Sequence, residues 1–242
     1  MGNRDLIINL EDIHFSYPGG QPVLNGVSLK FYRGDRVGLL GANGSGKTTL
    51  FQTIMGLLKP TGGRLEIIGR PCTTEDDFRF VRRKIGLLFQ DSDDQLFSPT
   101  VLEDVAFGPL NLGKSREEAM ASARSTLDYL GLKGFEDRIT YKLSGGEKRL
   151  VALATVLAME PEVLLLDEPT NGLDDRTREI LTHTLTRLDL SFILISHELD
   201  FVNQVTNTVF AMENGRILTD AEIHVHQHVH AHPYGSSAHK HS

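Results

Sequence analysis

The sequence predicts an α/β fold with a parallel sheet that is covered by helices on both faces. Two short apolar runs, at 163–166 and 192–195, are separated by a segment with helical spacing at 175–188. Such runs between helices are typical of parallel strands buried on both faces. A third predicted strand, 36–40, leads directly into a glycine-rich loop and then a helix over 46–57. An apolar content of 40% over 242 residues is sufficient for such a core.

The N-terminal residues predict an antiparallel β layer. Residues 5–17 favour a strand with alternating apolar side chains, and the Pro-Gly-Gly at 18–20 predicts a turn. A second strand is predicted at 27–32. After a break at 59–63, strand character resumes at 64–68.

The middle of the chain predicts a helical insert. A strand at 85–89 leads to an acidic loop, and a later helix at 146–159 is almost entirely apolar, which indicates burial on all sides. Between them, residues 101–112 and 116–130 carry helical spacing. We therefore expect a helical subdomain at about 91–148, inserted in the α/β core.

The last predicted strands form a hairpin. Residues 208–212 and 216–219 favour strand and are separated by Glu213-Asn214-Gly215, in which Asn-Gly is a strong hairpin signal. We therefore expect one folded domain over residues 5–220. Residues 221–242 form a histidine-rich tail that we expect to be flexible.

Composition limits the partners that this protein can have. The net charge of -7 argues against nucleic acid, which usually binds proteins with clustered positive charge. The single cysteine, Cys72, excludes an internal disulfide and a cysteine-cluster metal site within one chain. No apolar run reaches the roughly 18 to 20 residues of a membrane-spanning helix, so a partner would have to supply any such helices.

The glycine-rich loop matches the phosphate-binding pattern G-x-x-x-x-G-K-[ST] in full. Its residues are Gly41, Ala42, Asn43, Gly44, Ser45, Gly46, Lys47 and Thr48, and Thr49 follows. A predicted strand precedes the loop and a predicted helix follows it, as this pattern requires. Backbone N–H groups and the helix N-terminus would bind phosphates, Lys47 would add a cation, and Thr48 would offer a hydroxyl to Mg²⁺. The loop predicts a site for a nucleoside triphosphate.

An acidic pair follows the apolar run at 163–166. A carboxylate at the carboxyl end of a buried parallel strand lies where such sheets bind ligands, so Asp167 would hold Mg²⁺. Glu168 would polarise the attacking water. The alternative is an acidic turn ahead of Pro169.

A second anion site is predicted at Leu143-Ser144-Gly145-Gly146-Glu147. A serine hydroxyl and glycines at a helix N-terminus suit the outer phosphate of a nucleotide that another subunit holds. The same residues also fit a capping box, in which Ser144 and Glu147 satisfy exposed N–H groups at the helix start. The two interpretations are compatible.

The order of these parts resembles the ATP-binding-cassette (ABC) ATPase family. The matching segments are 41–48, Gln90, 143–147, 163–168, 173–174 and His197, and the resemblance covers about residues 5–220. It implies a RecA-like P-loop NTPase core with an N-terminal antiparallel β layer and a helical subdomain. It also implies that Tyr17 stacks on adenine, Gln90 senses the γ-phosphate and Mg²⁺, and His197 contacts the γ-phosphate. Individually, these three could be a strand aromatic, a loop polar residue and a helix-start residue.

The resemblance also implies a head-to-tail pair of ATPase subunits, either a homodimer or two closely related chains. Each nucleotide would lie between the phosphate loop of one chain and residues 144–146 of the other, and Asp174 would lie in a loop at that interface. Binding would close the dimer and hydrolysis would reopen it. One departure is Glu147, where most of the family has glutamine.

Two further segments, 90–97 and 105–109, look like those of ATPase subunits of energy-coupling-factor importers, notably the cobalt and nickel branch. Those ATPases work with a transmembrane scaffold subunit and a substrate-binding membrane subunit. The resemblance implies that the acidic loop and the helical insert contact the scaffold. The alternative is a solvated acidic loop followed by an ordinary helix.

The tail holds seven of the ten histidines, all within residues 224–242. In an extended chain five of them would point to the same side, since side chains alternate with period two. They are His224, His226, His228, His230 and His232. Imidazoles so placed suit Ni²⁺, Co²⁺, Cu²⁺ or Zn²⁺. The alternatives are a purification tag and low-complexity drift.

These observations together predict an ATPase that is peripheral to the cytoplasmic face of the cell membrane and drives uptake of a transition metal ion, nickel or cobalt. One alternative is a soluble ABC-type ATPase of DNA repair or iron-sulfur assembly. Another is an importer ATPase for a different substrate, such as a vitamin. A P-loop kinase would need neither residues 144–146 nor His197.

Overall fold

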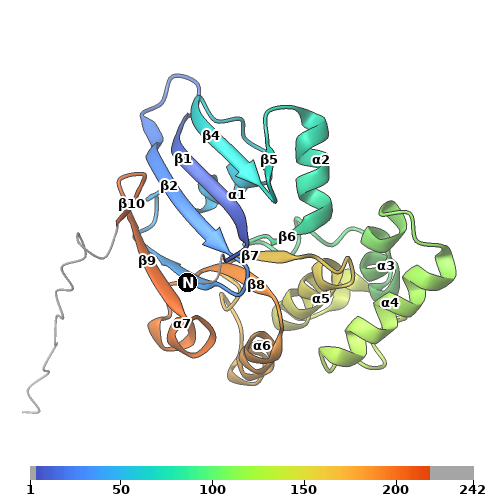
Figure 1. Ribbon diagram of the computed structural model, residues 1–242. Helices are drawn as coiled ribbons and strands as arrows, with labels where there is room; N and C mark the ends of the chain where they lie inside the picture. The colour runs from blue at the N-terminus through green and yellow to red at the C-terminus, as the bar shows by residue number, and fades with distance from the viewer. Residues whose placement is uncertain (1–3, 219–242) are drawn as a thin grey trace, which may run out of the picture.

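The computed structural model describes residues 4–218, and its antiparallel sheet confirms the predicted N-terminal layer (Figure 1). The strand order is β2-β1-β4-β5. Their bounds are Leu6–Ser16 for β1, Pro22–Tyr32 for β2, Gly62–Ile67 for β4 and Arg70–Pro71 for β5. Strand β2 begins five residues before its predicted start. Gly26, with φ +82°, lies at an irregularity in the β1–β2 pairing and interrupts the alternation on which the prediction depended.

The second sheet is the predicted parallel sheet, with strand order β10-β9-β3-β8-β7-β6. The strands are β3 Arg36–Leu40, β6 Ile85–Leu88, β7 Val163–Asp167, β8 Ser191–Ile195, β9 Thr208–Glu213 and β10 Arg216–Leu218. All neighbouring strands are parallel except β9 and β10, which form the predicted hairpin. Asn214 and Gly215 both have positive φ, as a tight hairpin turn requires.

Alternate side chains of the parallel strands enter two different cores. In β7, Leu164 and Leu166 face one hydrophobic cluster, whereas Val163 and Leu165 face the other. The antiparallel sheet, α1 and α2 cover one face of the parallel sheet, and α3 to α7 cover the other (Figure 1). Burial on both faces explains why β7 is one uninterrupted apolar run.

The helices largely follow the predicted segments. Their bounds are α1 Lys47–Ile54, α2 Glu75–Lys84, α3 Val101–Asn111, α4 Arg116–Tyr129, α5 Gly145–Leu157, α6 Asp175–Arg187 and α7 Leu199–Val205. Helix α1 ends three residues before its predicted end because Gly56 adopts φ +69° beyond it. The sequence did not predict α2, which buries only Phe78 and Val81, or the short α7.

Helices α3 and α4 lie beside α5, at one end of the parallel sheet (Figure 1). Both begin at capping boxes, formed by Thr100 with Glu103 and by Ser115 with Glu118. Their apolar faces share one hydrophobic cluster with α5 and the parallel sheet. None of the helices within residues 4–218 combines the length and the apolar character that crossing a bilayer requires.

Candidate active site

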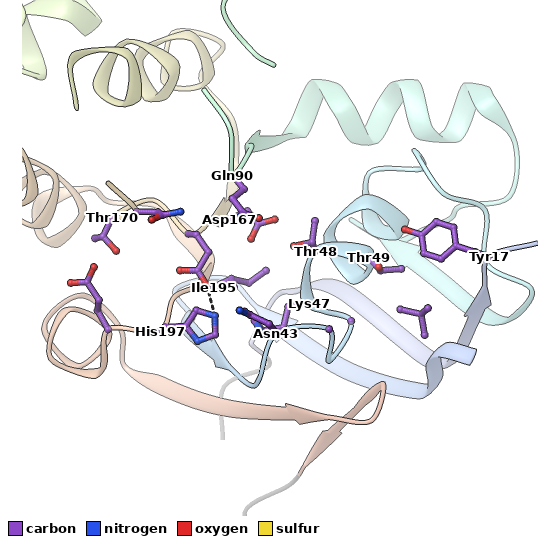
Figure 2. A pocket seen from close by; sticks show the side chains of 16 residues that line it. Tyr17, Asn43, Lys47, Thr48, Thr49, Gln90, Asp167, Thr170, Ile195 and His197 are labelled. Atoms are coloured by element: carbon purple, nitrogen blue, oxygen red, sulfur yellow. Dashed lines mark ion pairs between the residues drawn. The ribbon is translucent and has the colours of Figure 1, made fainter. Parts of the chain in front are cut away.

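The carboxyl ends of the parallel strands bring most of the predicted site residues together. Strand β3 leads into the phosphate loop, β6 ends two residues before Gln90, β7 ends at Asp167, and β8 ends two residues before His197. The strands run in the same direction, so these ends meet at one edge of the sheet. The cavity there has a volume of about 730 Å³ (Figure 2), a size typical of small-molecule sites.

Two glycines of the phosphate loop are required by its geometry. A Cβ on Gly41 would lie 2.3 Å from the carbonyl oxygen of Met212 in the β9–β10 hairpin. Gly46 adopts φ +105°, and a Cβ there would lie 2.8 Å from the carbonyl oxygen of Val23. The loop can therefore pack against β2 and the hairpin only with glycine at these positions.

The side chain of Lys47 is folded onto its own loop. Its Nζ donates to the carbonyl oxygens of Gly41 at 2.8 Å and Ala42 at 3.0 Å. Burial lowers the pKa of Lys47, while the nearby carboxylates of Glu168 and Asp167 raise it. The loop thus carries a largely buried ammonium group at the floor of the cavity.

Asp167 is a buried carboxyl group that lacks a full set of partners. Its side chain is only 3% exposed, and Oδ1 has no hydrogen-bond partner among residues 4–218. Burial raises the pKa of Asp167, and this effect is partly opposed by the Thr48 hydroxyl and the Lys47 ammonium. A buried oxygen without a partner, beside a threonine hydroxyl, fits a hard cation such as Mg²⁺.

Glu168 and His197 form the second polar pair of the cavity. His197 Nε2 lies 3.0 Å from Glu168 Oε1, as the dashed line in Figure 2 marks. Glu168 adopts φ +46°, an uncommon conformation for a non-glycine residue, and its N–H donates to the carbonyl oxygen of Ile195. Backbone strain of this kind is concentrated at functional sites.

The other predicted residues that line this cavity include Tyr17 and Gln90, which lie on opposite sides of Thr48 in the view of Figure 2. Asn43, Gly44 and Thr49 of the phosphate loop and α1 line it as well. Tyr17 follows β1, is 46% exposed, and makes an edge-on contact with Phe15. Ala42, Gly41 and Ser45 belong to the loop without lining the cavity.

Residues 144–146 and Asp174 do not line the cavity at the phosphate loop within the described chain, and they have structural roles of their own. Ser144 and Glu147 form the predicted capping box of α5, and Arg138 also pairs with Glu147 at 2.8 Å. Hydrogen bonds from Ser144 and the charge of Arg138 lower the pKa of Glu147. Asp174 caps α6 by accepting from the N–H of Thr177.

Gly145 lines a neighbouring cavity of about 640 Å³. Thr48, Gln90 and Asp167 line both cavities, so the two are adjacent. The walls of the second cavity also include the acidic loop at 91–94 and Arg149 of α5.

Several residues that line the cavity at the phosphate loop are not predicted by the sequence. They are Val23, Thr170, Asn171, Ile195 and Glu198. Four of these lie within three residues of Glu168 or His197 in the sequence. Their closeness to a predicted site residue was therefore a signal that could have identified them. Val23 had none, because it reaches the cavity only through the packing of β2 against the phosphate loop.

The predicted histidine cluster, His224, His226, His228, His230 and His232, lies outside the described residues. Within residues 4–218, no group of three or more His, Cys, Asp or Glu side chains could hold a metal ion.

A glycine-rich loop between a parallel strand and a helix, with an acidic residue at the end of a neighbouring strand, defines the class of P-loop nucleoside triphosphatases. The chain belongs to the ABC transporter family, whose family model matches residues 24–171. It is an ATPase of that family. ABC ATPases bind ATP and Mg²⁺ and work as dimers with transmembrane components.

Two relatives and one solved structure show which members of the family this chain is similar to. A protein of Nitratidesulfovibrio vulgaris, provisionally assigned as an ABC transporter ATP-binding protein, is 51% identical over 97% of this chain and 86% of its own length. The energy-coupling factor transporter ATP-binding protein EcfA of Methanothermobacter thermautotrophicus is 43% identical over 88% of this chain and 70% of its own. The structure of cbiO1 from Clostridium perfringens, part of the ABC transporter complex cbiONQ, superimposes with a TM-score of 0.79 at 37% identity, covering 89% of this chain and 88% of its own.

Proposed function

We propose that this chain is the ATP-hydrolysing subunit of an energy-coupling importer that takes up a transition metal ion, nickel or cobalt. The observation that carries the importer assignment is the similarity to EcfA and cbiO1 over most of the chain. The metal assignment rests on the resemblance of residues 90–97 and on the histidine-rich tail. The subunit would be peripheral to the cytoplasmic face of the cell membrane.

The ATP site would divide its work among the residues of the cavity. On binding of ATP, Lys47 would leave the carbonyl oxygens of its own loop and donate to the phosphates. Tyr17 would stack on the adenine, and Asn43, Gly44, Gly46 and Thr49 would surround the nucleotide.

Thr48, Gln90 and Asp167 would hold Mg²⁺, and the unpartnered Oδ1 of Asp167 supports this assignment. When bound, the ion offsets negative charge on the phosphate oxygens. Glu168 would act as the general base toward the attacking water. His197, already in contact with Glu168, would keep that carboxylate in place and reach the γ-phosphate.

A second ATPase subunit would complete the site. Ser144 and Gly145 at the start of α5 are exposed, and neither lines the cavity at the phosphate loop of the same chain. These residues are therefore available to the γ-phosphate of a nucleotide held by another copy or a closely related chain. Asp174 would lie at the same interface. Loss of the γ-phosphate on hydrolysis would remove the contacts that favour the closed pair.

The scaffold subunit would dock at an apolar groove that is lined by residues of α3, strand β6 and the C-terminal part of α5. The groove has a volume of about 250 Å³, and its walls include Leu57, Phe97 and Phe107. The two phenylalanines form an edge-on pair with ring centroids 4.8 Å apart, and both are exposed, Phe97 at 66% and Phe107 at 45%. We assign the groove to an apolar cytoplasmic helix of the scaffold, because exposed apolar patches mark interaction sites.

The groove is connected to the ATP site through Gln95. The side-chain oxygen of Gln95 accepts from the N–H of Phe89, next to Gln90, and its amide nitrogen donates to the carbonyl oxygen of Ala152 in α5. Gln95 also lines the groove. A shift of Gln90 would therefore be transmitted through Phe89 and Gln95 to the groove at which the scaffold docks.

The tail would bind the metal that the importer carries. The alignment with the relative from N. vulgaris covers 97% of this chain, so it extends into residues 219–242. This supports a native tail over a purification tag.

The decisive experiment is to isolate the membrane complex that contains this subunit and to measure ATP-dependent uptake of radioactive nickel and cobalt into proteoliposomes. Wild-type protein should support uptake of one of them. The variant Glu168→Gln should bind ATP, trap a closed dimer and abolish both hydrolysis and uptake. A complex that takes up a vitamin instead would overturn the metal assignment, and absence of any membrane partner would overturn the importer.

The tail is tested separately. Removing residues 224–242 should abolish metal binding by the isolated protein and leave ATPase turnover unchanged. Unchanged metal stoichiometry in that truncated protein would remove the tail from the proposal.

A further inference from the structure

Arg149 is a buried cation that the predicted site does not use. It lies in α5, one residue before an apolar run, and is only 5% exposed. Its guanidinium donates to the carbonyl oxygen of Phe89 at 2.6 Å and to that of Gln90 at 2.5 Å. These are the first two residues beyond strand β6. Arg149 therefore joins α5, which Ser144 caps, to the segment that carries Gln90.

The burial of Arg149 is unfavourable by itself. Among residues 4–218 the partners of the guanidinium are backbone carbonyl oxygens, and burial lowers its pKa while the charges of Asp91, Asp167 and Glu168 raise it. An apolar side chain packed at such a position is often at least as stabilising as a buried charge. The next residues of α5, Leu150 to Ala154, are apolar and buried. Core packing therefore does not account for arginine here.

Its hydrogen bonds do account for it. The segment after β6 has left the sheet, so the carbonyl groups of Phe89 and Gln90 need other donors. A planar guanidinium can supply two N–H groups in a fixed geometry, which a lysine ammonium on a flexible stem cannot. One acceptor belongs to Gln90, which lines the ATP cavity, and the other belongs to the residue before it.

The adjacent residue makes a weaker contact to the same loop. Lys148 Nζ lies 2.5 Å from Asp93 Oδ1, but the Asp93 side chain is 69% exposed and lies three residues beyond Gln90. Surface pairs of this kind contribute little. Lys148 therefore offers a control in the same helical turn: Lys148→Met removes a cation and its contact to the loop, a larger change in charge than Arg149→Lys makes, and leaves the bonds to Phe89 and Gln90 in place.

We propose that Arg149 is a positioning residue for ATP hydrolysis, which holds the backbone at Gln90 so that the Gln90 amide is aimed at the γ-phosphate and Mg²⁺. This inference rests on the role proposed above for Gln90. It also gives a direct connection between the ATP site of one chain and the α5 N-terminus that faces the nucleotide of its partner. When the Gln90 segment shifts on binding or loss of the γ-phosphate, α5 shifts with it.

The test measures steady-state hydrolysis by the full-length protein as a function of Mg²⁺ concentration. Arg149→Lys keeps the charge but loses one of the two hydrogen bonds. We expect kcat to fall by about 10- to 100-fold, the loss that misplacement of a positioned group by about 1 Å can cause. The Mg²⁺ concentration at half-maximal rate should rise, while affinity for a fluorescent ATP analogue without Mg²⁺ stays unchanged. Lys148→Met should leave the Mg²⁺ dependence unchanged.

A double-mutant comparison separates positioning from general damage to the fold. If Arg149 acts through Gln90, adding Arg149→Lys to Gln90→Ala should cause no further loss in kcat. Rates are normalised to the nucleotide-binding fraction, so that misfolded protein is not counted. Additive losses, or an unchanged Mg²⁺ dependence in Arg149→Lys, would overturn the role of Arg149. If Gln90→Ala itself left the Mg²⁺ dependence unchanged, the proposed role of Gln90 would fail instead.

Discussion

Replacing Asp167 by asparagine removes a buried charge and keeps the shape of the side chain. The carboxyl group is 3% exposed, one of its oxygens lacks a partner among residues 4–218, and burial raises its pKa. An unpaired buried charge costs more than an unpaired neutral polar group, for which the cost is about 1–3 kcal/mol, and Lys47 and Thr48 offset a part of the difference. We therefore expect Asp167→Asn to stabilise the metal-free protein at neutral pH by about 1 kcal/mol. Position 167 would then be one at which the residue needed for activity lowers the stability of the protein. In a chain of this length the expected stabilisation raises Tm by about 2–4 °C.

The measurement is scanning calorimetry in EDTA and again with saturating ATP and Mg²⁺. Wild-type protein should gain more from ATP with Mg²⁺ than the variant does, because it keeps the carboxylate that holds the ion. The order of Tm values should then reverse, and the variant should lose most of its ATPase activity. Asp128→Asn, at an exposed aspartate in α4, is the matched control and should leave the Tm unchanged both in EDTA and with ATP and Mg²⁺. A lower Tm for Asp167→Asn in EDTA, or an equal gain from Mg²⁺, would refute the reasoning.

Three further predictions concern other parts of the chain. Gly46→Ala should destabilise the protein by about 1–3 kcal/mol in urea unfolding and weaken ATP binding, and Gly44→Ala should cost less. Both glycines have positive φ, but a Cβ at Gly44 meets no atom within 4 Å; equal losses would contradict the clash. The pKa of Glu162 is lowered by Lys84 and a neighbouring arginine. Glu162 should therefore add about 0.5–1 kcal/mol to the free energy of unfolding at neutral pH, and this contribution should be lost as the pH falls through the pKa of Glu162 in the folded protein. The urea-unfolding difference from Glu162→Gln should therefore shrink as the pH falls below about 4.3, the ordinary pKa of a glutamate. Ser144→Arg, introduced beside Glu168→Gln, should prevent ATP-dependent dimers in light scattering and spare nucleotide binding by the monomer; loss of monomer binding would indicate misfolding instead.

The elements that the sequence predicts are those whose signal is local. The phosphate loop is a continuous run, and β7 and β8 are apolar on both sides because both faces of the sheet are covered. The Asn214-Gly215 turn is likewise determined by two adjacent residues. Helix α2 was missed because it buries few side chains, although the capping box of Thr74 with Asp77 marked its start.

The sequence by itself determined the chemistry of this protein: which residues could bind phosphate, which could hold Mg²⁺ and which could act as a base. These properties belong to short motifs whose residues are neighbours in the chain. Only the tertiary structure decided how the motifs are combined. The order of β3, β8 and β7 brings His197 within 3.0 Å of Glu168, 29 positions earlier in the sequence. The same packing buries Arg149 against Gln90 and keeps Ser144 outside the cavity of its own chain. Contacts between distant segments depend on which strands pair and which faces are covered, and no local pattern of residues specifies that.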